Sequence, residues 1–310
     1  MKRPPLGVLL PLGLLLACPC PCPCSSGVDF GYTKIIFSSD NHLVTPVSVN
    51  HPPVTWWAVD TGAPRSIIDP ELATRLGLQV VDQLKANPYD ADKGSTFPIV
   101  ETNDLLIGMF RAGRVACVER SIKTIRSLRT TIWKGRFEKT GLLGLDLLEK
   151  YGAIINIRAG KIFFSPTGNL GISRQGYEQV GFTYVPLAVT GGRLVVNGTI
   201  SGEKCAFFID TGMPFTILDE SVRRRANIPF NRAGALTLPF ITGTAIRLNS
   251  GTAVDFRFGD YDAKGAILRF GAFSFRPFAG IIGVDFLYYR SALIDIGGRA
   301  LYLKPSTSGR

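Results

Sequence analysis

Apolar residues in this chain fall into short runs of about four to seven residues, separated by polar residues and by turns rich in glycine and proline. Runs of this length, such as those that begin at Leu43, Trp56, Leu194 and Ala206, are typical of β-strands. No apolar run approaches the ~20 residues of a membrane-spanning helix. The pattern therefore predicts an all-β body with a few short helices.

The same order of elements occurs twice along the chain. A hairpin and a buried strand end in Asp60-Thr61-Gly62, and a second set ends in Asp210-Thr211-Gly212. A further pair of matched blocks, Gly141–Leu148 and Gly280–Leu287, closes the two halves. Since internal repetition of this kind marks a repeated structural unit, we expect two homologous lobes.

Each half is predicted to contain a hairpin, a buried strand, an acidic turn, a short helix, a hairpin-rich stretch, a second apolar strand, a short helix and a final hairpin. Asp146 and Asp285 stand where the N-cap of the second helix would lie. The predicted domains are a first lobe over 28–168, a glycine-containing linker over 169–181 and a second lobe over 182–310.

The N-terminus adds a targeting signal to this picture. A basic start and an apolar stretch over Leu6–Leu16 are typical of a secretory signal peptide, which we assign to residues 1–17. The sequence Leu15-Leu16-Ala17-Cys18 resembles the bacterial lipobox, so we expect Cys18 to carry lipid and to anchor the protein in the bacterial cell envelope, facing the periplasm or the exterior. Ordinary cleavage and secretion is the alternative. Alternating cysteine and proline make residues 18–27 an extended spacer.

The formal net charge of +11 is concentrated between Arg111 and Lys139. Apolar residues recur there at helical spacing, which predicts a short basic amphipathic helix whose basic face lies in solvent or rests on anionic lipid. The charge is not interleaved with stacking aromatic residues, and no nucleic-acid reader motif is present. We therefore expect no nucleic-acid partner.

Candidate metal ligands are sparse. The two histidines, His42 and His51, belong to the first predicted hairpin without the spacing of a metal motif, so we expect surface positions for them. Cys117 and Cys205 lie in apolar surroundings in different halves, which favours buried thiols over an inter-lobe disulfide. We expect neither a metal nor a cofactor.

Two copies of Asp-Thr-Gly, each followed by an apolar-apolar-Gly-x-Asp block, resemble the pepsin and retropepsin clan of aspartic proteases. Retropepsins carry one copy and dimerise, whereas this chain carries both, so the resemblance implies a monomer. It also implies the bilobal acid-protease fold, with two retropepsin-like β-barrel lobes and an active-site cleft between them. The implied activity is that of an aspartic endopeptidase acting on a peptide or protein substrate. Residues 89–97, with Tyr89, and 241–251 are candidates for a flap over that substrate.

The resemblance assigns Asp60 and Asp210 as the catalytic pair. Two adjacent carboxylates that share one proton can deprotonate a water molecule and protonate the substrate carbonyl. Thr61 and Thr211 would hydrogen-bond the backbone of the opposite lobe and so hold the two acidic loops face to face.

The remaining loop residues are Gly62 and Gly212, which would allow the tight turn, followed by Ala63 in the first copy and Met213 in the second. Neither Ala63 nor Met213 can donate a hydroxyl hydrogen bond to the carboxylates, which predicts an optimum at weakly acidic to near-neutral pH. Met213 stands where the family usually has Ala, Ser or Thr. It motivates the alternative function, a catalytically inactive bilobal peptide-binding module of the cell envelope.

Overall fold

The structure, a computed structural model, describes residues 30–38, 42–50, 52–86, 94–122, 139–229, 231–239, 245–252, 255–272 and 277–305. The predicted signal peptide and spacer with Cys18, together with His51, Tyr89 and most of the basic segment, lie outside these residues. No helix in the described ranges is long and apolar enough to cross a membrane.

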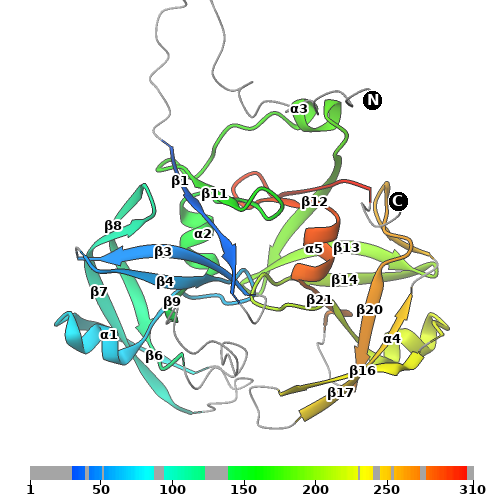
Figure 1. Ribbon diagram of the computed structural model, residues 1–310, viewed down its shortest axis with the longest axis horizontal. Coiled ribbons are helices and arrows are strands. Elements are labelled where there is room, and N and C mark those ends of the chain that lie inside the picture. Colours follow the sequence, from blue (N-terminus) through cyan, green and yellow to red (C-terminus); the bar gives the residue numbers. More distant parts are fainter. Residues whose placement is uncertain are drawn as a thin grey trace, which may run out of the picture.

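The first half of the chain forms the lobe on the left of Figure 1. Its 8-stranded sheet has the order β2 (Ile36–Phe37), β3 (Leu43–Val49), β4 (Val54–Val59), β9 (Lys139–Leu143), β5 (Ile67–Ile68), β8 (Phe110–Glu119), β7 (Thr96–Ile107) and β6 (Gln79–Lys85). An additional pairing of β3 with β7, in which Val47 lies opposite Ile107, closes the sheet from β3 to β7 into a barrel. Helix α1 (Pro70–Arg75) begins at Asp69, whose carboxylate accepts a hydrogen bond from the Glu71 N–H.

The second half repeats this strand order. The sheet runs through β13 (Arg193–Ile200), β14 (Glu203–Ile209), β21 (Gly280–Ile282), β15 (Ile217–Asp219), β20 (Ile267–Gly271), β17 (Ala245–Thr252) and β16 (Asn231–Pro239), as β3, β4, β9, β5, β8, β7 and β6 do in the first half. Strands β18 (Phe256–Phe258) and β19 (Tyr261–Asp262) extend the sheet from β13. Asp219 caps α4 (Glu220–Arg225) as Asp69 caps α1. The predicted all-β, bilobal fold is thereby confirmed.

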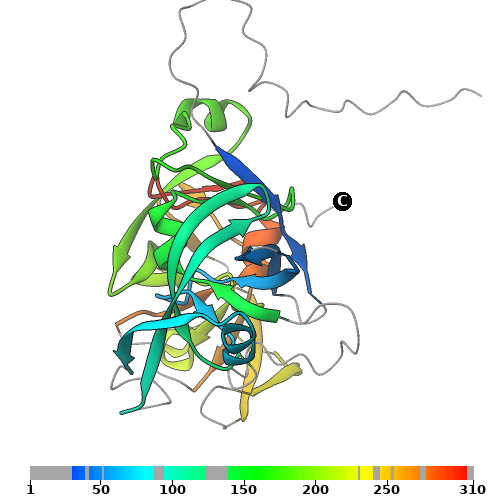
Figure 2. The ribbon, with the colours of Figure 1, turned by 90° about the vertical axis from the view of Figure 1, so that its left-hand side faces the viewer.

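A central sheet joins the two lobes. Its order is β1 (Gly31–Lys34), β11 (Lys161–Phe164), β10 (Ile154–Asn156), β22 (Leu293–Asp295), β23 (Ala300–Leu303) and β12 (Thr183–Thr190). The join is the antiparallel pairing of β10 with β22, in which Ile155 lies opposite Ile294. Helix α3 (Arg174–Gln179), which lies between the halves in the sequence, sits at one end of the molecule in both Figure 1 and Figure 2.

The start of two helices corrects a sequence-based prediction. Helices α2 (Leu145–Lys150) and α5 (Val284–Tyr289) have Gly144 and Gly283 as N-caps, so the N-cap prediction for Asp146 and Asp285 is wrong. A Cβ atom on Gly144 would lie 2.4 Å from a backbone carbon of the acidic loop in front of it. The N-cap at position 144 therefore requires glycine. Asp146 and Asp285 instead bind the acidic loops of their own halves.

The largest hydrophobic cluster contains residues of both halves, among them the fully buried side chains of Trp57, Phe164 and Phe207. Cys117 belongs to this cluster and Cys205 packs against it half-buried; both are free thiols, as favoured over a disulfide. Burial raises the pKa of both thiols, which keeps them protonated near neutral pH.

The surface position predicted for His42 is wrong, because only 3% of this residue is exposed. Its backbone N–H donates to Ser38 Oγ at 3.2 Å, and its ring Nδ1 lies 3.4 Å from Lys139 Nζ. Lys139, the first residue of β9, thus lies against the ring. Across the described ranges, no group of three or more His, Cys, Asp and Glu residues is placed to hold a metal ion.

Candidate active site

The buried strands β4 and β14 each end at one of the predicted catalytic aspartates. Val59 and Ile209, the last residues of these strands, are fully buried. Strand β9 runs parallel to β4, and β21 runs parallel to β14. The Asp60 N–H donates to the Leu143 carbonyl at 3.0 Å, and the Asp210 N–H donates to the Ile282 carbonyl at 3.1 Å. The second matched block of each half therefore fixes the position at which its aspartate leaves the sheet.

Backbone N–H groups in each acidic loop point at the carboxylate. Gly62 donates to Asp60 Oδ1 at 2.8 Å, and Gly212 donates to Asp210 Oδ1 at 2.8 Å. Ala63 also donates to Asp60 Oδ1, at 3.1 Å. These bonds stabilise an ionised carboxylate and fix its orientation.

The two glycines are needed for the close approach of the lobes. A Cβ atom on Gly62 would lie 2.3 Å from the carboxyl carbon of Asp210, and a Cβ atom on Gly212 would lie 2.4 Å from that of Asp60. Each carboxyl group thus packs directly over the glycine of the opposite loop. Besides the tight turn predicted for them, these glycines leave room for the facing aspartate.

Thr61 and Thr211 lock the loops across the lobe boundary, and both are fully buried. The Thr61 hydroxyl donates to the Ile209 carbonyl at 2.8 Å and accepts from the Thr211 N–H at 3.1 Å. The Thr211 hydroxyl donates to the Val59 carbonyl at 2.7 Å and accepts from the Thr61 N–H at 3.0 Å. The four bonds are related by the internal symmetry of the chain, so they hold the two aspartates in equivalent positions on the two sides of the lobe boundary.

The carboxyl groups of Asp60 and Asp210 face each other across the lobe boundary, each against the glycine of the opposite loop. Burial and the adjacent Asp60 raise the pKa of Asp210 well above its ordinary value, while Arg193 and the Gly212 N–H oppose the rise. Two carboxyl groups that face each other in a buried site cannot both ionise readily, so such a pair holds one proton between them. The pair is therefore suited to act as acid and base at once.

Each acidic loop is also held from behind by the aspartate of the helix that follows the second block. In the first half the Ser66 hydroxyl donates to Asp146 Oδ1 at 2.7 Å and accepts from the Gly144 N–H at 2.9 Å. In the second half the Thr216 hydroxyl donates to Asp285 Oδ1 at 2.8 Å. This contact links residues about 70 to 80 positions apart, so no local pattern in the sequence predicts it.

The second of these networks contains a cation. Arg269 donates to Asp285 Oδ2 at 2.7 Å, and its guanidinium lies 3.9 Å from the centre of the Phe215 ring. Burial raises the pKa of Asp285, whereas Arg269 and the Thr216 hydroxyl oppose the rise.

Apolar clusters flank the pair on both sides. Ala63 packs against a first-lobe cluster together with Leu84 and Phe97. Met213 packs in the second lobe against a cluster that contains Phe208, and Phe278 packs against the same cluster. Of the predicted flap residues 89–97, only 94–97 are described. Among them, Phe97 packs against the same apolar cluster as Ala63.

The structure thus brings together every loop residue that the sequence singled out, from Asp60 to Ala63 and from Asp210 to Met213. Arg193, whose Nη1 donates to the Gly62 carbonyl at 2.6 Å, was not foreseen. Its only signal in the sequence is the Gly191-Gly192 turn before it, which marks a hairpin tip but not what the tip contacts.

The chain is similar to known proteins in part of its sequence and in its fold. A family profile described as aspartyl protease matches residues 45–147, which include the first acidic loop and the first helix-start aspartate. The aspartic proteinase from Irpex lacteus superposes with a TM-score of 0.54 at 14% identity, covering 90% of this chain and 98% of that chain. Basic 7S globulin from soybean gives a TM-score of 0.48 at 12% identity, covering 90% of this chain and 96% of that chain. No curated protein sequence matches the chain.

The chain has the pepsin/retropepsin-like aspartic protease fold.

Proposed function

We propose that this protein is an aspartic endopeptidase in which Asp60 and Asp210 activate a water molecule to hydrolyse peptide bonds. The observation that carries the proposal is the pair of carboxyl groups, one from each half of the chain, each packed over the glycine of the opposite loop and held face to face by Thr61 and Thr211. The aspartyl protease profile over the first half and the fold of the whole chain support a protease-like function of the aspartic type.

Because the pair shares one proton, one carboxyl group can act as the base and the other as the acid. The ionised carboxyl of the pair accepts a proton from water, whose oxygen attacks the peptide carbonyl carbon, while the protonated carboxyl donates its proton to the carbonyl oxygen. When the tetrahedral intermediate collapses, the proton taken from water passes to the leaving amine, and one hydroxyl of the intermediate returns a proton to the other carboxylate as the product carbonyl forms, which restores the shared proton. The loop N–H groups of Gly62 and Gly212 stabilise the negative charge that the pair keeps throughout.

Digestion of a peptide library by the purified protein tests the proposal. Asp60→Asn and Asp210→Asn should each reduce turnover by about 10⁴-fold or more without changing the unfolding midpoint, and the double variant should be scarcely worse, because members of one catalytic unit are not additive. Asp82→Asn, which removes an exposed carboxylate on β6, is the control and should cleave as the wild type does.

Three outcomes decide between the candidates. Equal loss in both single variants supports the intrachain pair. Cleavage at the wild-type rate by Asp210→Asn would overturn it and favour a dimer of first halves. Peptide binding by the wild type without cleavage of any peptide would favour the alternative function, an inactive bilobal peptide-binding module.

We also propose that lipid on Cys18 tethers the protein to a membrane of the bacterial cell envelope, on the strength of the lipobox-like sequence before it. Cys18→Ser should abolish incorporation of a labelled fatty acid, whereas Cys20→Ser, in the spacer, should not. Unchanged labelling of the Cys18→Ser protein would contradict the anchor.

A further inference from the structure

The internal symmetry of the acidic loops is broken by Arg193. Its Nη1 donates to the carbonyl of Gly62 at 2.6 Å, although Arg193 belongs to the second half of the chain and Gly62 to the first. The guanidinium carbon lies 4.8 Å from the centre of the Phe208 ring, and the residue is half-buried. An arginine that stacks on a ring and donates to a backbone carbonyl is held in one orientation.

The hairpin of β12 and β13 brings Arg193 to this place. Thr190 pairs with Arg193, and the two-residue turn between them, Gly191-Gly192, has φ angles of +59° and +70°. A Cβ atom on Gly192 would lie 3.4 Å from the Cβ atom of Pro64, so the tip of the hairpin packs against the first acidic loop. The two glycines permit the tight turn, and the turn aims the arginine at the loop of the other lobe.

The first half places a different residue at the corresponding position. His42 precedes β3 as Arg193 begins β13, and its buried ring lies 3.4 Å from Lys139 Nζ. The arginine is therefore a feature of the second half alone, and it acts on the loop of the first half.

We propose that Arg193 is a positioning residue of the aspartate pair, which fixes the Asp60 loop from the opposite lobe and places a permanent positive charge beside Asp210. Its effect on turnover rests on the proposed function, whereas its effect on the titration of the pair does not.

The direction of the electrostatic effect follows from the charges that surround Asp210. Asp60 and burial disfavour its ionised form, and Arg193 favours it. Asp285 and Arg269, behind the same loop, are paired with each other. Loss of the Arg193 charge should therefore raise the pKa of Asp210.

Substitution of Arg193 tests both parts of this inference. Arg193→Gln keeps a hydrogen-bond donor and Arg193→Met keeps an apolar contact with Phe208, but both remove the charge. Each should shift the acidic limb of the pH profile of kcat/KM upward by about one pH unit, as expected for an aspartate that loses a neighbouring arginine. Arg193→Lys keeps the charge and should hold the limb within a few tenths of a unit of the wild type.

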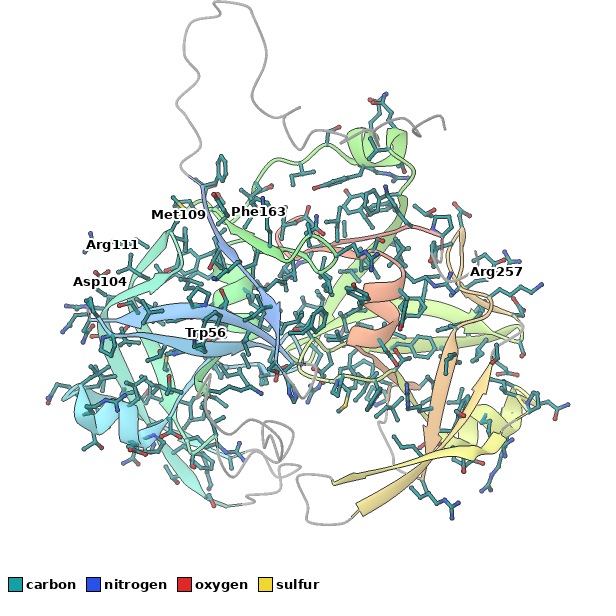
Figure 3. The ribbon with its side chains drawn as sticks, viewed as in Figure 1. Trp56, Asp104, Met109, Arg111, Phe163 and Arg257 are labelled. Atoms are coloured by element: carbon teal, nitrogen blue, oxygen red, sulfur yellow. The ribbon has the colours of Figure 1, made fainter. Side chains whose placement is uncertain are left out.

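The effect of Arg193 on the position of the first acidic loop is measured through kcat. Because a small displacement of a catalytic group is costly, we expect kcat to fall by about tenfold or more in the Gln and Met variants, with a smaller change in KM. Arg257→Gln is the matched control: Arg257 lies at the outer edge of the same lobe, where it pairs with the exposed Asp255, and Figure 3 labels it far from the acidic loops. Its pH profile should overlay that of the wild type.

A titration that needs no activity separates this inference from the proposed function. The carboxyl carbons of ¹³C-labelled aspartate can be followed by NMR from pH 3 to 8, with Asp210→Asn used to assign the pair. An upward shift of the pair in Arg193→Gln and Arg193→Met supports the inference even if the wild type cleaves no peptide, which would defeat only the proposed function. Carboxyl titrations that match the wild type in both variants would overturn the inference, whatever the activity.

Discussion

The two acidic loops differ in the residue that follows their glycine. Ala63 follows Gly62, whereas Met213 follows Gly212, and the Met213 side chain packs on the apolar cluster that includes Phe208. The Gly212 N–H still donates to Asp210 at 2.8 Å, as the Gly62 N–H does to Asp60. Methionine at this position therefore leaves the hydrogen bond between loop and carboxylate intact. It affects the aspartate pair because it has no hydroxyl to donate.

That missing hydroxyl gives a pH prediction. A hydroxyl that donates to the ionised carboxyl stabilises the ionised form and lowers its pKa, so Met213→Ser should move the pH profile of kcat/KM toward acid by up to about one unit. Met213→Ala is the matched control, because it loses the same partly buried apolar contact without gaining a hydroxyl. The wild type, in which burial raises the pKa of Asp210, should have its optimum at weakly acidic to near-neutral pH. Superimposable profiles for the Ser and Ala variants would contradict this explanation.

At the scale of elements, local patterns predict what local forces determine. Strands and acidic turns depend on residues a few positions apart, so the sequence predicts the elements in their correct order twice. The same reasoning fails for Asp146 and Asp285. Their partners, Ser66 and Thr216, lie in another element, and the helix-start pattern alone favours a cap.

Contacts between elements of different halves are the part that the sequence does not specify. The pairing of β10 with β22 and the contact of Arg193 with the first acidic loop both join segments more than 100 residues apart. Neither hairpin carries a local signal for its distant neighbour. Only the duplication itself, through the resemblance to aspartic proteases, predicts that Asp60 and Asp210 meet.

Over the whole molecule, the two lobes are joined in three ways that reinforce one another. The central sheet pairs β10 with β22, the largest hydrophobic cluster includes residues of both halves, and the threonines cross between the acidic loops. Since the first two involve many contacts, the lobes remain together without the threonines. The threonine bonds are then left to determine the relative position of the two aspartates.

This division of roles gives a prediction for Thr61→Val and Thr211→Val. Valine has nearly the shape of threonine but no hydroxyl, so each variant leaves a buried carbonyl and a buried N–H of the opposite loop without their partner. Each unsatisfied group costs about 1–3 kcal/mol, so we expect each variant to lose about 2–4 kcal/mol of unfolding free energy and to lose turnover by about 100-fold.

The double variant is the sharper measurement. Because both sets of bonds span the same boundary, the loss of one loosens the other, and the double variant should lose about 1 kcal/mol less than the sum of the single losses in denaturant titrations. Thr74→Val, on the exposed face of α1, is the control and should stay within about 0.5 kcal/mol of the wild type. Strictly additive losses would mean that the two threonines act on separate loops and do not form one lock. Wild-type turnover in either single variant would mean that the central sheet alone positions the aspartates.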